Sequence, residues 1–145
     1  MALFQMEFHP RWSDLDPNQH LRHTAYNDLA TQVRFTFLQE HGFSQERFME
    51  LGIGAVLFRE ETTFRKEIGM SDTFLVDFDV VDLSKTGKRW KFAHNFWLIR
   101  ETEDGSEQKI KAATVSVEGS WINLSTRKFT SPPPELLTLF QSLTA

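Results

Sequence analysis

The spacing of the apolar residues changes near residue 55, and this change limits the fold more than any other feature of the chain. Residues 24–41 show helical spacing, because apolar side chains recur three, four, seven and eleven positions after Tyr26. Those side chains are Leu29, Ala30, Val33 and Phe37, and two more apolar residues, Phe35 and Leu38, widen the stripe. We predict a well-buried helix that Thr24 caps and Gly42 ends.

From residue 55 onward, apolar residues recur mostly at every second position in four successive runs, which is the spacing of half-buried β-strands. The runs cover 56–64, 74–80, 90–98 and 113–121, and the first of them places Val56, Phe58, Thr62 and Phe64 in one phase. Glycine-containing turns separate the runs, so an antiparallel meander is expected. His94 falls in an apolar phase, where we expect a hydrogen-bonded histidine of the core or of an interface.

The rest of the chain adds short elements. We expect a strand within residues 2–12 that Pro10 restricts to a sheet edge, and a short helix from Ser44 through Leu51. Three prolines at 132–134 break the chain before a terminal helix over Glu135–Leu143. The economical arrangement is an α+β fold, in which a curved antiparallel sheet wraps around one long helix and residues 1–145 form a single domain.

Composition removes several classes of function. The chain of 145 residues has no cysteine, which excludes disulfides, thiolate chemistry and zinc sites built on cysteine. A net charge of −4 argues against a nucleic-acid partner, which requires a basic face. The sequence has no apolar run long enough for a membrane span, and its first residues lack the basic region of a signal peptide. We therefore expect a cytoplasmic location.

Acid, amide and imidazole side chains crowd into the segment Asp14–His20, directly before the predicted long helix. Unpaired backbone N–H groups at a helix N-terminus stabilise a developing negative charge, so this position suits acid–base chemistry. Two other interpretations remain open. Asp14 and Asp16 are also typical turn and capping residues. His20 and His23 with Asp16 would form a metal site, although histidines four apart on a helix are the stronger pattern.

The segment Arg11–Tyr26 resembles the active-site segment of hotdog-fold thioesterases, both the 4-hydroxybenzoyl-CoA thioesterase-like and the acyl-ACP thioesterase-like branches. A second segment, Thr63–Met70, is similar to an aromatic-basic-basic-Glu string of the same enzymes. The resemblance implies the hotdog fold, with a central helix wrapped by a sheet. It implies four catalytic residues, namely Asp16, Asn18, His20 and Glu67. Asp16 would then deprotonate water or attack the thioester carbonyl directly.

Substrate-binding candidates follow at the start of the helix. Backbone N–H groups around Thr24 to Tyr26 are positioned to hold an oxyanion. His23 competes with His20 for one role, because a related acyl-CoA branch uses a histidine at that position. Seven basic residues are candidates for contacting the phosphates of a carrier, namely Arg59, Arg65, Lys66, Lys85, Lys88, Arg89 and Lys91.

The function expected from this resemblance is hydrolysis of acyl-CoA without a cofactor or metal ion. The alternatives are an acyl-ACP thioesterase and a protein that binds acyl thioesters without hydrolysing them. The acyl-ACP enzymes carry two hotdog repeats in one chain, whereas this chain has one. We therefore expect a homodimer or homotetramer that completes the sites between copies.

Overall fold

The computed structural model describes residues 4–144, and these form three α-helices and one six-stranded antiparallel sheet. The helices are α1 (His23–Glu40), α2 (Gln45–Leu51) and α3 (Pro134–Leu143), and a short 3-10 helix, η1, spans Trp12–Asp14. The strands are β1 (Phe4–Phe8), β2 (Ile53–Phe64), β3 (Thr73–Leu83), β4 (Arg89–Glu101), β5 (Glu107–Asn123) and β6 (Phe129–Thr130). None of the helices described is long and apolar enough to cross a membrane.

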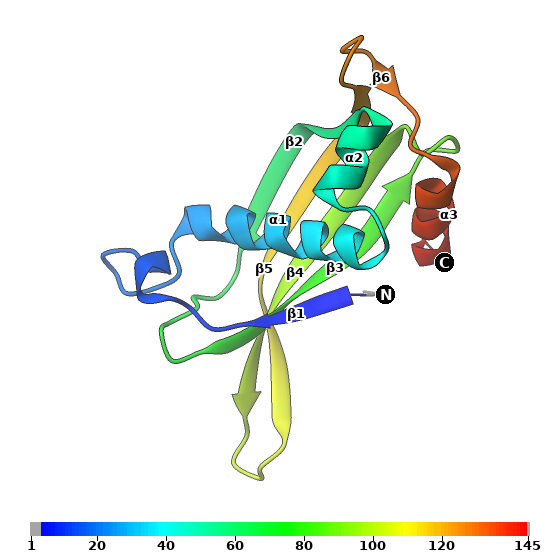
Figure 1. The fold of residues 1–145 in the computed structure, drawn as a ribbon. Helices are drawn as coiled ribbons and strands as arrows, with labels where there is room; N and C mark the ends of the chain where they lie inside the picture. Colours follow the sequence, from blue (N-terminus) through cyan, green and yellow to red (C-terminus); the bar gives the residue numbers. More distant parts are fainter. Residues whose placement is uncertain (1–3, 145) are drawn as a thin grey trace.

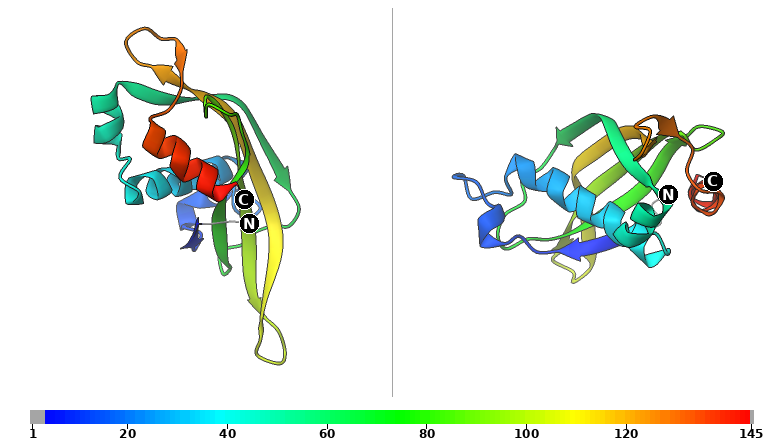
Figure 2. Two further views of the ribbon diagram at one scale, coloured as in Figure 1. Left: turned by 90° about the vertical axis from the view of Figure 1, so that its right-hand side faces the viewer. Right: turned by 45° about the horizontal axis from the view of Figure 1, so that its top comes forward.

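The strands follow the order β1-β3-β4-β5-β2, with the two residues of β6 beside β5 (Figure 1). The sheet curves, and the three helices lie on one side of it (Figure 2, left). This arrangement confirms the predicted α+β hotdog fold. The hairpin of β4 and β5 extends beyond the other strands as a long arm (Figure 1).

Alternate residues of the three central strands form the core beneath α1. The predicted phases of β3, β4 and β5 are confirmed, because all of their inward residues are buried. In β4 these are Trp90, Phe92, His94, Phe96 and Leu98. Burying one such apolar side chain contributes about 1.5–3 kcal/mol, so this layer holds α1 in place.

The helix α1 differs from its prediction at two points. It begins at His23, so its N-cap is Arg22 rather than Thr24. Phe35 is 57% exposed, because it lies nine residues after the buried Tyr26 and a helix turns about 100° per residue, which places it on the opposite face. The predicted stop is confirmed: Gly42 has φ +87°, the left-handed conformation that ends helices. Ser44 caps α2 by accepting the Arg47 N–H at 3.2 Å.

The strand β2 lies at the sheet edge and is more exposed than its apolar pattern predicted. A bulge between Leu57 and Arg59 takes Phe58 out of the predicted phase. Phe58 and Phe64 are 44% and 54% exposed, because no further strand of residues 4–144 covers β2. The predicted short helix and terminal helix are both present as α2 and α3.

The N-terminal strand is shorter than predicted. β1 ends at Phe8 at the other sheet edge, as Pro10 requires, and residues 12–14 form η1 instead of strand. Residues 2 and 3 of the predicted strand lie outside the described residues. The two-residue strand β6 carried no periodic signal and was not predicted.

Candidate active site

The loop between η1 and α1 is a tight hairpin-like turn. The Gln19 N–H donates to the Asp16 carbonyl at 2.9 Å, and the Asp16 N–H donates to the His20 carbonyl at 2.9 Å. Pro17 occupies the second position of the first turn, where its fixed φ is favoured. Gln19 has φ +65°, a left-handed conformation that non-glycine residues rarely adopt. The backbone therefore fixes where the side chains of this loop point.

The Asp16 carboxylate is oriented by this loop. Its Oδ1 accepts the backbone N–H groups of Asn18 at 2.9 Å and of His20 at 3.1 Å. Its Oδ2 has no hydrogen-bond partner among residues 4–144. Asp16 thus performs the turn role that its residue type suggests, and one oxygen remains for chemistry.

Asp14 has a different environment from Asp16. Its carboxylate is buried and accepts the guanidinium of Arg11 at 2.8 and 3.1 Å, and the Arg11 backbone N–H at 3.0 Å. The hydrogen bonds from Arg11 hold the pKa of Asp14 below its usual value. Asp14 also forms an ion pair with the Arg22 guanidinium at 3.5 Å, so it anchors the segment before α1.

A second loop, after β2, brings Glu67 to His20. The Leu21 N–H donates to the carbonyl of Ile68 at 2.7 Å, and His20 pairs with Gly69 as an isolated antiparallel bridge. Ile68 is fully buried and fixes this loop to the core. Glu67 Oε2 consequently lies 3.6 Å from His20 Nε2, while most of the Glu67 side chain is exposed.

These two loops, the start of α1 and the end of β2 surround a cavity of about 810 Å³. It is lined by six of the seven predicted site residues, namely Asp16, Asn18, His20, His23, Tyr26 and Glu67. Both candidate histidines reach it, so the competition between His20 and His23 stays open. Leu21 and Phe64 add apolar wall.

Thr24 does not line this cavity. Its hydroxyl accepts Nε of Arg22 at 2.9 Å. The Ala25 N–H donates to the Arg22 carbonyl at 3.0 Å and is therefore occupied. In the part of the chain that the structure describes, the N–H groups of His23 and Thr24 have no acceptor. The candidate oxyanion donors are thus Thr24, which is within the predicted range, and His23, which lies one residue before it.

Tyr26 forms the floor of the cavity. Its ring packs against Phe64 and Phe96 with centroid distances of 5.1 and 4.9 Å. Burial, and then the negative charges of Asp16 and Glu67, raise the pKa of Tyr26 to about 12. The phenol therefore stays protonated at neutral pH and can donate a hydrogen bond.

Three cationic side chains also line the cavity. Arg65 and Lys66, two of the seven basic candidates, directly follow β2, and Arg100 reaches in from the β4–β5 arm. Arg65 donates to Thr114 Oγ1 at 3.2 Å, and Arg100 donates to Asp72 Oδ1 at 3.3 Å. Arg100 was not predicted, because a single arginine at the end of an alternating strand carries no local signal.

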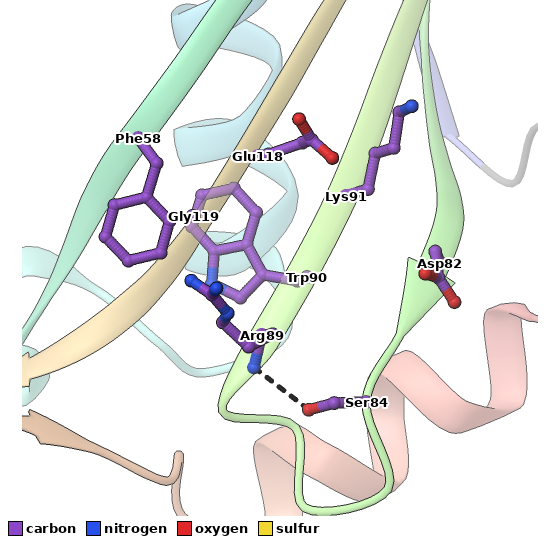
Figure 3. A pocket seen from close by; sticks show the side chains of 8 residues that line it. All are labelled: Phe58, Asp82, Ser84, Arg89, Trp90, Lys91, Glu118 and Gly119. Atoms are coloured by element: carbon purple, nitrogen blue, oxygen red, sulfur yellow. Dashed lines mark hydrogen bonds between the residues drawn. The ribbon is translucent and has the colours of Figure 1, made fainter.

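A smaller cavity of about 380 Å³ lies at the other end of the sheet, beside the β3–β4 turn (Figure 3). Acidic and basic residues alternate across three neighbouring strands here. In the strand register Lys91 of β4 lies opposite Asp82 of β3 on one side and Glu118 of β5 on the other. The Arg89 guanidinium lies 4.8 Å from the centre of the Phe58 ring. Two of the predicted phosphate contacts, Arg89 and Lys91, are therefore remote from the Asp16 cavity.

His94 is a buried, hydrogen-bonded histidine of the core, as expected. Arg34 donates to its Nε2 at 3.0 Å, so Nδ1 carries the proton and donates to the Asp77 carbonyl at 2.7 Å. Burial and the nearby Arg34 charge lower the pKa of His94 to about 3. No group of three His, Asp or Glu side chains within residues 4–144 is placed to hold a metal ion.

A family model described as "Thioesterase-like superfamily" matches residues 10–140. None of the curated proteins compared with this sequence matches it.

Among solved structures, a hypothetical protein of Staphylococcus aureus in complex with CoA is 24% identical, with a TM-score of 0.83 over 97% of this chain and 83% of that one. A DHNA-CoA thioesterase of Staphylococcus aureus is 19% identical, with a TM-score of 0.77 over 96% and 89%. A 1,4-dihydroxy-2-naphthoyl-CoA thioesterase of Synechocystis is 16% identical, with a TM-score of 0.74 over 98% of both chains. At these identities the likeness shows the fold.

Proposed function

We propose, since this chain belongs to the thioesterase-like superfamily, that it hydrolyses acyl-CoA thioesters to the free acid and CoA. The observation that carries the proposal is the Asp16 carboxylate. One of its oxygens is fixed by two backbone N–H groups, and the residue lines a cavity with His20, Glu67 and the start of α1. A positioned carboxylate beside unpaired N–H groups suits acyl transfer to water.

The chemistry needs a nucleophile and a site for the oxyanion. The leaving thiol has a pKa of about 8.5, so it departs readily as the thiolate near neutral pH. Asp16 Oδ2 takes a proton from water as the water oxygen adds to the thioester carbonyl. The C–S bond then breaks, the proton held by Asp16 passes to the thiolate with His20 as the relay, and the acid leaves. Direct attack by Asp16, followed by hydrolysis of the anhydride, is the alternative route.

The neighbouring groups have supporting roles in this proposal. The N–H groups of His23 and Thr24 receive the oxyanion, because they begin α1 without acceptors among residues 4–144. Glu67 orients the His20 ring across the 3.6 Å contact. The protonated Tyr26 phenol donates to the substrate or to the water, and Asn18 orients the carboxylate through its backbone.

Several neighbours of similar fold support CoA as the carrier. One structure contains CoA, and two others are of enzymes named as CoA thioesterases. An acyl-ACP substrate is the second candidate, because it presents the same thioester on a protein carrier. An acyl-thioester-binding role without turnover is the third, and it predicts that the Asp16 carboxylate is dispensable.

We also propose that two or more copies assemble, and that this assembly completes the site. β2 is a sheet edge whose apolar residues Leu57, Phe58 and Phe64 are about half exposed. An exposed apolar edge strand favours pairing with another chain. Light scattering on the purified protein distinguishes a dimer or tetramer from a monomer, and a monomer would contradict this part of the proposal.

The experiment for the whole proposal is thiol release from short, long and aromatic acyl-CoA esters, run beside the matching acyl-ACP. Turnover of at least one acyl-CoA is the expected result. Turnover of acyl-ACP alone would move the assignment to the second candidate. Tight binding of the esters without any thiol release would move it to the third.

A further inference from the structure

A buried carboxylate in the sheet begins a hydrogen-bond chain that ends at the cavity. Asp77 is 3% exposed, and its carboxylate accepts the Asn95 N–H at 2.6 Å and the Trp97 Nε1–H at 3.0 Å. Within residues 4–144, no cation forms an ion pair with it. Burying a carboxylate among neutral donors costs free energy. Hydrogen bonds that connect Asp77 to a cation would offset part of this cost.

Such hydrogen bonds run from Asp77 through Asn95 and Thr114 to Arg65, and each has a defined donor and acceptor. The Asn95 side-chain amide donates to Asp77 at 3.3 Å, which leaves its Oδ1 to accept the Thr114 hydroxyl at 2.9 Å. The Thr114 oxygen in turn accepts Arg65 Nη1 at 3.2 Å. Each partner fixes the donor or acceptor role of the next, and aligned hydrogen bonds of this kind strengthen one another. Arg65 is the cation at the end of the chain.

Arg65 is thereby tethered at the cavity by one of its five N–H donors. Arg100 lines the same cavity and is tethered through Asp72. The bonds leave donors of both guanidinium groups uncommitted. A guanidinium binds a phosphate through two parallel hydrogen bonds, and tethering reduces the conformational entropy lost on binding. Two arginines that are already held by hydrogen bonds should therefore bind a phosphate more tightly than two mobile arginines.

We propose that Arg65 and Arg100 bind the phosphate of the carrier's pantetheine arm, and that Thr114, Asn95 and Asp77 are positioning residues for Arg65. The inference rests on the proposed thioester substrate. It is supported by the presence of both arginines in the lining of the cavity that Asp16 and Glu67 also line. The same phosphate occurs in CoA and in an acyl carrier protein, which share the phosphopantetheine arm.

The test is a binding titration with 4′-phosphopantetheine and with pantetheine, which differ by one phosphate. We expect the wild-type protein to bind the phosphorylated compound at least 10-fold tighter. Arg65→Gln should remove most of this advantage, because a charge-assisted hydrogen bond contributes about 1.5–3 kcal/mol, or roughly 10- to 150-fold. Thr114→Val should reduce it about 5-fold through the lost tether, and Thr114→Ser should restore it.

Ser116→Ala is the matched control, because Ser116 lies one step along the same face of β5 and outside the chain of hydrogen bonds. It should leave both affinities unchanged. Equal affinities of the wild type for the two compounds would overturn the proposal. An unchanged phosphate advantage in Thr114→Val, or equal weakening of both compounds, would overturn the positioning role.

The titration stands apart from turnover. A phosphate advantage in a protein that hydrolyses no thioester would contradict the proposed hydrolysis and leave this inference intact. Hydrolysis without a phosphate advantage would support the proposed hydrolysis and contradict the assignment of Arg65 and Arg100 to the phosphate. Titrating CoA and a holo acyl carrier protein separately identifies the source of the phosphate, and the source that binds should lose affinity in Arg65→Gln.

Discussion

The backbone N–H of His20 lies 3.1 Å from Oδ1 of Asp16, so the residue proposed as the base also holds the loop that carries its neighbours. The two roles use different oxygens of one carboxylate. An alanine at this position would remove both, whereas an asparagine retains a carbonyl oxygen for the loop and loses only the charge. The structure therefore indicates which substitution separates catalysis from folding.

The contact between His20 and Glu67 predicts a graded loss of activity. His20→Ala should lower kcat about 100-fold or more, which is the usual effect of removing an acid–base group. Glu67→Gln should lower it less, because the Glu67 side chain is largely exposed and its contact is 3.6 Å long. Steady-state kinetics on the best acyl ester provide the measurement. Glu50→Gln, on an exposed position of α2 outside the cavity lining, is the control. A larger loss in Glu67→Gln than in His20→Ala would contradict the assigned roles.

From the environment of Asp14 we predict that the free energy of unfolding decreases at acid pH. Its pKa is lowered in the folded state, chiefly by the Arg11 hydrogen bonds, so its contribution is present above the unfolded pKa of about 4 and is lost as pH falls below it. Asp14→Ala should reduce the free energy of unfolding at pH 7 by roughly 1–3 kcal/mol, since buried donors lose their acceptor. Urea unfolding at pH 7 and pH 3 measures both effects. Equal stability of the two proteins at pH 7 would show that Asp14 is not an anchor.

His94 predicts a second pH dependence, at higher pH. Its pKa falls to about 3 in the folded protein, so the unfolded chain binds more protons below pH 6.5. The stability it contributes is present above pH 6.5 and declines toward pH 3, by at most about 1.4 kcal/mol per pH unit. Unfolding measured between pH 7 and pH 5 should show this slope in the wild type and in His9→Gln, an exposed histidine. The slope should be smaller in His94→Gln, and an unchanged slope there would refute the assignment.

Gly119 predicts a steric requirement in β5. A Cβ at this position would lie 2.1 Å from the Val56 carbonyl oxygen and 2.6 Å from the Trp90 ring. Gly119→Ala should therefore destabilise the protein by about 3 kcal/mol, the upper range for overpacking. Gly54→Ala is the matched control, because its nearest neighbour is a flexible Leu124 side chain at 3.2 Å. Thermal unfolding compares the two, and equal melting temperatures would argue against the clash.

Periodicity predicted the central strands because their large apolar residues share one face and most of the residues between them are polar. At positions that are less buried, the apolar pattern predicted burial that the structure does not show. Phe35 is apolar but points away from the sheet, and Phe58 sits at a bulge that no local signal announces. The N-cap of α1 lies two residues before the predicted Thr24, because Arg22 caps the helix without a side-chain hydrogen bond.

The part of the candidate site that is contiguous in the sequence could be predicted. The part that is formed by side chains from different strands could not. The turn chemistry and the family-like string of Asp14–His20 placed Asp16, Asn18 and His20 in one loop. Arg100 and the chain from Asp77 to Arg65 depend on side chains from β3, β4 and β5 meeting across the sheet. Sequence spacing carries no information on such contacts before the strand register is known.

The most direct test of the account is the rate of acyl-CoA hydrolysis by Asp16→Asn beside the wild type, with urea unfolding of both proteins. We expect kcat to fall at least about 100-fold. We also expect a free energy of unfolding within about 1 kcal/mol of the wild type, since the amide oxygen keeps the bonds to Asn18 and His20. Near-normal hydrolysis by a folded Asp16→Asn protein would contradict the central role of this carboxylate.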